Sequence, residues 1–468
     1  MTKRAKKKPN IIFVTMDACR PDHLGYMGYK KNTSPFLDSL VKKGTYFTRA
    51  FATGPGSPHS FVAIFTSTHP FDYGGFAYID RPRVLLSEVM QKNGYTTMGI
   101  HSAAYMSGYF GYDRGWDKFK YLSPFGDGDI MQGVKPGTWQ TWVAKKFDVI
   151  RNWAYTRGSL AKQIVAIIEK YGVFVWRKIF NDLIKNYKPP FFIAEEVNEE
   201  VKKILPRATQ KPLFLWVHYM DPHGPYGLFW KKSRELVKRM KFHLCDFIGY
   251  LFGEFPLINK WFLPLYLELY DSSIKYTDEH IEKLFKYLTS IDVLNDESVV
   301  VICSDHGEEF MERGWVGHNA SLWNFNLNVP LIFYGKKHIA SGMVIDRPVS
   351  LIDISPTVLD LAGLPKEKTF KGRNIFDKAK RPVVGQVPYT DSDLSNQRFL
   401  GASVIYDGYK FINILDQKKK SLSLEEKKML FSLENDFAEN VNLYDKEKEI
   451  AERLEKILKP YEFIRSNK

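Results

Sequence analysis

The sequence predicts an α/β fold, a doubly wound sheet with helices on both faces. Short apolar runs typical of buried strands alternate with helical patterns through the first third of the chain and again after residue 210. Hydrophobic residues make up 44% of the chain and charged residues 26%, a composition that suits a large packed core and excludes disorder, a collagen-like fibre or a disulfide mini-protein. The 468 residues fit one large α/β domain and a smaller one.

Three of the predicted strands end in polar residues. The runs NIIFVTMD, PLFLWVHYMD and SVVVICSDHG lead to Asp17, to Asp221 and to the pair Asp305 and His306. In an open α/β sheet, ligands bind outside the carboxyl ends of the strands, where the loops meet along a rigid edge. The three endings therefore predict a functional site at this edge.

Two basic stretches interrupt the pattern, and we expect helical insertions near residues 120–205 and 228–265. The segment from Lys145 to Lys188 holds ten Lys or Arg against three acidic residues, and a second cluster, KKSRELVKRMK, begins at Lys231. Helices of this kind pack an apolar face on a core, lie on a membrane or bind a polyanion. If they flank the predicted site, their charge steers or docks an anionic substrate.

The composition changes near residue 381 to short strands, a charged run and a final helix. We therefore assign residues 1–380 to a large domain that carries the site, and residues 381–468 to a small C-terminal subdomain. The final run, EKEIAERLEKILKPYEF, has the periodicity of an amphipathic helix.

The chain carries 67 Lys plus Arg against 53 Asp plus Glu, a formal net charge of +14. This excess favours anionic partners, either sulfate or phosphate esters, including those of a glycan or lipid, or a membrane surface. We expect no nucleic acid partner. The three cysteines are scattered, and we find no signal peptide and no run of about 18 apolar residues. These features predict a cytoplasmic protein with at most a peripheral contact to a membrane surface.

The side chains at the strand ends suit a divalent metal ion. Adjacent Asp305 and His306 offer a carboxylate oxygen and an imidazole nitrogen to a common point, and Asp17 supplies a second carboxylate. A hydroxyl is a suitable fourth ligand, since a metal ion positions it and lowers its pKa. Ser57 lies in a Gly/Pro-rich turn before an apolar helix, where free N–H groups bind an anionic ester. The alternative role of Ser57 is that of an N-cap.

Several motifs follow one another from residue 9 to about residue 375: PNIIFVTMDACRPDHLGYMGY, TSPFLDSLVKKGTYFTRAFA, IFTSTHP, GYDRGWDKF, HYMDPHGPY, SDHGEEF, GHNASLW with NVPLIFYG, and SLIDISPTVLDLAG. With these motifs the chain resembles the sulfatases and related hydrolases of the alkaline-phosphatase superfamily, and LENDFAENVNLYD resembles a C-terminal segment of that family. The resemblance implies an alkaline-phosphatase-like sandwich. Its central sheet is large, mixed and mainly parallel, helices flank it, and a small α+β subdomain follows.

The resemblance also implies roles for individual residues. Asp17, Asp305 and His306 match metal ligands, and Ser57 matches the metal-bound nucleophile. His223, in HYMDPHGPY, matches a histidine that contacts the ester and can protonate the leaving group.

Further residues are expected to contact the substrate. His318, in GHNASLW, matches a substrate-contacting lysine or histidine, and we group it with the catalytic residues. We assign Arg20, His101 and Asp221 to substrate binding. Asp221, His223 and His318 together are also the candidate ligands of a second metal ion.

The nucleophile motif departs from the family pattern. The run from Ser57 to Phe61 is Ser-Pro-His-Ser-Phe, without the proline at its third and the arginine at its fifth position that direct conversion to formylglycine in a typical sulfatase. Ala18 replaces the second aspartate of the family's Asp-Asp pair, and Ser102 and Ala104 stand where a lysine and a histidine are expected. Two mechanisms stay open: a formylglycine derived from Ser57 attacks sulfur, or unmodified Ser57 attacks phosphorus.

We therefore expect a metal-dependent hydrolase of sulfate or phosphate esters with one divalent ion. Because the ligand set contains an imidazole and lacks one carboxylate, manganese or zinc suits it better than calcium, which stays compatible. One alternative is a phosphodiesterase or phosphotransferase that moves a headgroup to a lipid or glycan through phospho-Ser57. An alternative of another class is a non-catalytic protein that binds polyanions or membranes.

Overall fold

The computed structural model describes residues 8–122, 191–205, 211–224, 226, 256–318, 321–388, 399–415 and 427–462. Most of the two predicted basic insertions lies outside these residues. The described parts of the insertion ranges include the end of strand β4 (Lys118–Tyr121) and two helices of the sandwich, α6 (Ala194–Ile204) and α8 (Pro256–Ser290).

A mixed, mainly parallel sheet forms the centre of the molecule, as predicted. Its strand order is β10-β2-β9-β6-β1-β5-β3-β4, and β11 also pairs with β2. Only β9 runs antiparallel to its neighbours, β2 and β6. The strands are β1 (Ile11–Met16), β2 (Thr45–Phe51), β3 (Thr96–His101), β4 (Lys118–Tyr121), β5 (Leu213–Tyr219), β6 (Val299–Ser304), β9 (Asn328–Tyr334), β10 (Met343–Ile345) and β11 (Val349–Ser350).

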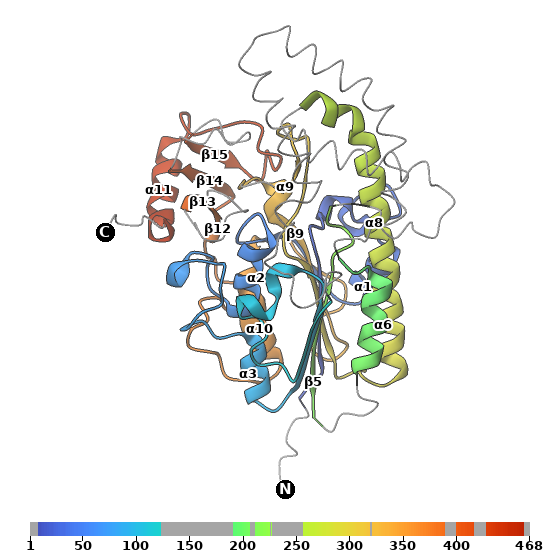
Figure 1. Cartoon of the computed structure of the whole chain (residues 1–468). Helices are drawn as coiled ribbons and strands as arrows, with labels where there is room; N and C mark the ends of the chain where they lie inside the picture. Colours follow the sequence, from blue (N-terminus) through green and yellow to red (C-terminus); the bar gives the residue numbers. More distant parts are fainter. Residues whose placement is uncertain are drawn as a thin grey trace, which may run out of the picture.

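Helices cover both faces of this sheet (Figure 1). One layer contains α1 (Pro35–Val41), α6 and α8, whose apolar side chains pack with Ile12 and Val14 of β1. The other contains α2 (Ser57–Thr66), α3 (Leu86–Lys92) and α10 (Ile354–Leu361), which pack with Ile11 and Phe13. Because successive side chains of a strand point to opposite faces, a strand between two helical layers must be apolar throughout. This explains why β1, β5 and β6 are buried along their whole length.

Helix α8 runs from the end of the second predicted insertion range along the sheet. Its side chains Tyr266, Leu269 and Tyr270 are buried in the core. Among the helices that the structure describes, none combines the length and the apolar character needed to cross a bilayer.

A second sheet lies beside the sandwich, at the C-terminal end of the chain (Figure 1). It is antiparallel, with the order β12 (Val383–Pro388), β13 (Phe399–Tyr406), β14 (Tyr409–Ile414) and β15 (Lys428–Ser432), and α11 (Lys448–Leu458) packs on β13 and β14. This matches the predicted small α+β subdomain, while the boundary at residue 380 stays a prediction.

Short elements complete the described structure. A hairpin of β7 (Glu309–Phe310) and β8 (Val316–Gly317) and the short helix α9 (Asn324–Leu327) follow β6. The 3-10 helices are η1 (Pro21–His23), η2 (Gly25–Met27), η3 (Asp72–Gly74), η4 (Ala104–Met106), η5 (Gly108–Phe110), η7 (Leu351–Asp353) and η8 (Lys459–Tyr461).

A buried ion pair joins the C-terminal sheet to α9. Lys410 Nζ of β14 lies 2.6 Å from Glu439 Oε1 and donates to Asn324 Oδ1 at 2.8 Å, and both charged side chains are at most 1% exposed. The other carboxylate oxygen of Glu439 accepts the Asn324 N–H at 2.6 Å. Glu439 belongs to the LENDFAENVNLYD motif, so this motif anchors the subdomain to the segment that follows the β7–β8 hairpin.

Candidate active site

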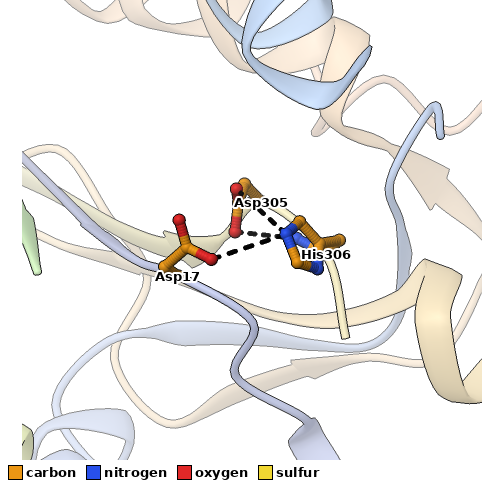
Figure 2. Close-up of side chains that lie close together, drawn as sticks. All are labelled: Asp17, Asp305 and His306. Carbon is orange, nitrogen blue, oxygen red and sulfur yellow. Dashed lines mark hydrogen bonds and ion pairs between the residues drawn. The ribbon is translucent and has the colours of Figure 1, made fainter. Parts of the chain in front are cut away.

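Two neighbouring strands bring Asp17, Asp305 and His306 together. β1 pairs in parallel with β6, with Met16 opposite Ser304, so the residues that follow the two strands emerge side by side. Figure 2 shows the three side chains pointing toward one another. His306 Nε2 lies 3.5 Å from Asp17 Oδ1 and 3.6 Å from Asp305 Oδ2, and all three side chains are fully buried. We call these three residues the acidic-histidine cluster.

Each carboxylate of the cluster has one satisfied and one unpartnered oxygen. Asp305 Oδ1 accepts the backbone N–H groups of Ala18, at 3.2 Å, and His306, at 2.9 Å. Asp305 Oδ2 and Asp17 Oδ1 are buried and accept no hydrogen bond from the described residues. His306 Nδ1 lies 2.7 Å from Gly307 O and donates to it, which leaves the Nε2 lone pair free. Two unpartnered oxygens and one free nitrogen lie within 4.8 Å of one another, so the cluster fits a divalent cation.

Electrostatics of the cluster support the same conclusion. Burial and the nearby charge of Asp17 raise the pKa of the Asp305 carboxyl well above its usual range. Burial also lowers the pKa of His306 well below its usual range. For Asp17, the raising effect of burial is outweighed by surrounding histidines, and its pKa is lowered. Two adjacent buried carboxylates repel each other when both are ionised, and a bound cation removes this repulsion.

Ser57 is the first residue of α2 and faces the cluster. Its Oγ donates to Asp17 Oδ2 at 3.1 Å and lies 3.3 Å from His306 Nε2. The N-cap of α2 is Gly56, so the alternative role of Ser57 as N-cap is wrong. The turn before it is tight, because a Cβ on Gly54 would lie 2.4 Å from His59 Cβ.

His318 and His223 lie beside the cluster. The His318 ring centroid is 4.4 Å from that of His306 and 4.9 Å from that of His223. His318 Nδ1 donates to Glu308 Oε1 at 3.1 Å, since an ionised carboxylate is only an acceptor. His223 Nδ1 contacts Gly224 O. The structure thus brings both predicted histidines to the acidic-histidine cluster, and it adds Glu308, which sequence reasoning missed.

Arg20 does not face the cluster. Its guanidinium forms four hydrogen bonds, to both carboxylate oxygens of Asp22, to Glu312 and to the Glu308 carbonyl oxygen. The residue is only 7% exposed. The contact to Glu308 O ties Arg20 to the segment that follows β6, and the assignment of Arg20 to substrate binding stays a prediction.

Asp221 and His101 also lie outside the cluster. Asp221 Oδ1 accepts the N–H of Ala194 at the start of α6, at 3.2 Å, and burial raises the pKa of this carboxyl to about 7. His101 is fully buried, stacks on Trp216 at 5.3 Å between ring centroids and donates from Nδ1 to Ala103 O at 3.1 Å. Their assignment to substrate binding stays a prediction.

The structure also bears on the number of metal ions. Within the described residues, the only group of three or more His, Cys, Asp or Glu side chains with converging ligand atoms is the acidic-histidine cluster. The alternative second metal site at Asp221, His223 and His318 is therefore not formed by these side chains.

His218 lies beside the cluster and was not among the predicted site residues. Its Nε2 lies 3.3 Å from Asp17 Oδ2, and both side chains are fully buried. The contact arises because β1 pairs with β5 and places Thr15 opposite His218. A histidine within an otherwise apolar strand is the signal that could have indicated a role for His218. The sequence does not show which residue of β1 lies opposite it.

The fold and the cluster define a hydrolase that acts on ester bonds at the carboxyl edge of an α/β sheet. The chain belongs to the sulfatase family, since the model of the family described as Sulfatase matches residues 9–364. The predicted family, fold class and enzyme class are thereby confirmed.

Individual relatives are distant in sequence and similar in fold. A sulfatase of Formosa agariphila is 24% identical over 436 residues, which cover 87% of this chain and 79% of the relative. An ulvan-active sulfatase of the same organism is 24% identical over 80% of this chain, which spans 66% of that relative. The structure of BT4656 in complex with its substrate, D-glucosamine-2-N,6-O-disulfate, has a TM-score of 0.63 at 18% identity and covers 97% of this chain and 98% of its own. The phosphonate monoester hydrolase of Agrobacterium radiobacter also has a TM-score of 0.63, at 17% identity. The similarity covers 97% of this chain and 95% of the hydrolase.

Proposed function

We propose that this protein hydrolyses sulfate or phosphate esters with one divalent metal ion and with Ser57 as its nucleophile. The observation that carries the proposal is the position of the Ser57 hydroxyl, 3.1 Å from Asp17 Oδ2 and 3.3 Å from His306 Nε2. An exposed serine or a simple helix cap would not need two carboxylates and an imidazole, all buried, beside it.

Asp17, Asp305 and His306 would hold the metal ion, and the Ser57 hydroxyl would complete the set. Members of the sulfatase family are generally metal-dependent. An imidazole with two carboxylates favours manganese or zinc over calcium. When bound, the ion lowers the pKa of the serine hydroxyl and neutralises negative charge that develops on the ester.

The residues of the chain then have separate tasks. Asp17 Oδ2 accepts the hydrogen bond of Ser57 and is placed to take its proton. With unmodified Ser57, the free Oγ would form a bond to phosphorus, and the bond from phosphorus to the ester oxygen would break. The leaving oxygen would receive a proton from His318 or His223, whose rings lie beside the cluster. Water would then attack phosphorus and break its bond to Oγ, which releases phosphate and returns a proton to Ser57. The N-terminus of α2 would stabilise the anion.

The first turn of α2 favours unmodified Ser57, and hence a phosphate ester. Position 61, where a typical sulfatase has an arginine, holds Phe61, which is fully buried with its ring 5.7 Å from that of Trp216 and 5.1 Å from that of His218. His59 is fully buried, and burial lowers its pKa to about 3, so this turn adds no cation. Family membership supports the second candidate, sulfate ester hydrolysis by a formylglycine derived from Ser57.

The substrate proposed for either mechanism is an ester of a glycan. Its support is that a relative is an ulvan-active sulfatase and that a protein of the same fold was solved with a disulfated glucosamine as its substrate. A lipid ester, peripheral membrane contact and a cytoplasmic location remain predictions from the basic composition of the sequence. Transfer of a headgroup by phospho-Ser57 remains the alternative to hydrolysis.

An assay with a panel of esters tests the proposal. Purified protein, freed of metal by a chelator and then supplied with manganese, zinc or calcium, is assayed with aryl sulfate, aryl phosphate and an aryl phosphodiester. Intact mass measurement distinguishes serine from formylglycine at position 57. We expect metal-dependent release of phosphate and loss of turnover in Ser57→Ala. Sulfate release with formylglycine would establish the second candidate, whereas no metal binding and no turnover with any ester would favour a binding protein.

A further inference from the structure

We infer that His218 is a positioning residue, which orients Asp17 so that one carboxylate oxygen serves Ser57 and the other faces the metal ion. The inference rests on the proposed function, because it assigns a task in the same site. It concerns a buried chain of contacts that runs from Trp216 through Thr15 and His218 to Asp17.

The four side chains lie on two adjacent strands or directly after them. Trp216 Nε1 donates to Thr15 Oγ1 at 2.9 Å, and Thr15 Oγ1 lies 2.8 Å from His218 Nδ1. The other ring nitrogen of His218, Nε2, lies 3.3 Å from Asp17 Oδ2. All four side chains are fully buried, so water does not compete for these polar atoms.

The donors in this chain determine the position of the His218 proton. The Trp216 indole can only donate, and it occupies one lone pair of Thr15 Oγ1. The Thr15 hydroxyl proton then has His218 Nδ1 as its acceptor in the described part of the chain. Since Nδ1 accepts, the neutral ring carries its proton on Nε2, which faces the Asp17 carboxylate. The opposite tautomer would leave the buried Thr15 hydroxyl without an acceptor and direct an Nε2 lone pair at a carboxylate oxygen.

Aromatic side chains keep the His218 ring in this orientation. The Phe61 ring stands edge-on to it at 5.1 Å and 86°, and Trp216 stacks beside it at 6.0 Å and 25°. The ring therefore has little freedom to turn away from Asp17.

The two oxygens of Asp17 differ as a result. Oδ2 faces two groups, the Ser57 hydroxyl and His218. Oδ1 is buried, accepts no hydrogen bond from the described residues and lies 3.5 Å from His306 Nε2. His218 thereby decides which oxygen of Asp17 remains available to a cation, as the outer partners of metal ligands do in other sites.

Titration of metal-free protein with manganese chloride, followed by calorimetry, tests the inference. His218→Phe keeps a flat ring and removes the N–H, and we expect it to weaken manganese binding about 10- to 100-fold. His218→Gln restores an N–H donor near the position of Nε2, and we expect it to recover part of the affinity. Thr15→Val removes only the hydroxyl that fixes the tautomer and should weaken binding by a smaller factor.

His23 supplies a matched control. It is also a buried histidine on a carboxylate, with Nδ1 2.7 Å from Asp271 Oδ1, but it does not contact the cluster. His23→Phe should bind manganese as the wild-type protein does. Thermal unfolding of each variant shows whether the titrated protein is folded. If His218→Phe does not fold, the manganese affinity of Thr15→Val tests the inference.

The outcomes separate the two proposals. Wild-type affinity in both His218→Phe and Thr15→Val would overturn the inference alone, as would an equal loss of affinity in His23→Phe. A wild-type protein that binds neither manganese nor zinc would overturn the proposed function, and this inference with it.

Discussion

Buried aspartates follow three strands at the carboxyl edge of the central sheet, but their surroundings differ. At the ends of β1 and β6, Asp17 and Asp305 each leave one buried oxygen without a partner, and the two oxygens face the same imidazole. At the end of β5, Asp221 Oδ2 is also buried and unpartnered within the described chain, but its other oxygen accepts the N–H that begins α6. Within the residues that the structure describes, Asp221 belongs to no converging group of three or more His, Cys, Asp or Glu side chains.

The difference shows how a protein satisfies a buried carboxylate. A single one is satisfied most simply by a proton, and burial accordingly raises the pKa of Asp221 to about 7. Two carboxylates with an imidazole between them are better satisfied by a divalent cation. A polar residue at a strand end is therefore evidence for a site only where neighbouring strands supply converging partners.

Among the variants that test this difference, we expect Asp305→Ala to have the largest effect. The change removes one of the converging oxygens and leaves the other two residues of the cluster. Loss of a residue that only hydrogen-bonds to a metal ligand typically weakens metal binding roughly 10- to 100-fold, and we expect a larger loss here. Turnover should be lost in parallel. Calorimetric titration with manganese and an ester assay measure the two effects. Wild-type activity in this variant would show that the cluster is not the site.

Glu308→Ala should have an intermediate effect, because Glu308 holds His318 beside the cluster without belonging to it. We expect kcat to fall about tenfold to a hundredfold, within the range that a misplaced general acid costs, with little change in metal affinity. Glu308→Gln keeps an acceptor for His318 Nδ1 and should retain more activity.

The adjacent buried residue Glu309 gives the control for this prediction. Its Oε1 accepts the backbone N–H groups of Arg313 and Trp315 and does not contact His318. Steady-state kinetics of Glu309→Gln should resemble those of the wild type. An equal loss of kcat in both variants would mean that the β7–β8 hairpin, rather than the Glu308 carboxylate, is responsible.

Asp221→Asn should have the smallest effect, and on stability rather than on metal binding. The folded pKa of about 7 lies above the usual value of 3.8, so between these pH values the folded protein holds a proton that the unfolded chain has lost. The Asp221 contribution to stability therefore falls as pH rises through this window. We expect Asp221→Asn to unfold at a higher temperature than the wild type at pH 8. The difference in unfolding temperature should decrease toward pH 4. A difference that does not change with pH would contradict the assignment.

Much of the site could be predicted from the sequence, because its main residues sit where local pattern is most informative. Asp17, Asp305 and His306 directly follow continuous apolar runs, and Ser57 lies between a Gly/Pro-rich turn and an apolar helix. The mixed character of the sheet followed from the family resemblance, whereas the C-terminal subdomain was also indicated by the change of composition near residue 381.

The remaining site residues depend on pairing between distant segments. His218 reaches Asp17 because Thr15 and His218 are opposite each other in neighbouring strands. Glu308 reaches His318 because the β7–β8 hairpin folds back, with Glu309 opposite Gly317. Arg20 contacts Glu308 and Glu312, which are nearly three hundred residues away in sequence. The sequence pattern of a single segment does not show which distant residues will contact it.

The buried pair of Lys410 and Glu439 makes the C-terminal sheet an inseparable part of the enzyme rather than an exchangeable module. If that sheet and the Glu439 segment after it were replaced by unrelated ones, the Asn324 N–H at the entry to α9 would lose its acceptor. If only Glu439 were retained, it would be an uncompensated charge in a dry interior, a defect that costs about 3–5 kcal/mol. Any recombination of this chain with a relative must therefore exchange β14, the Glu439 segment and α9 together.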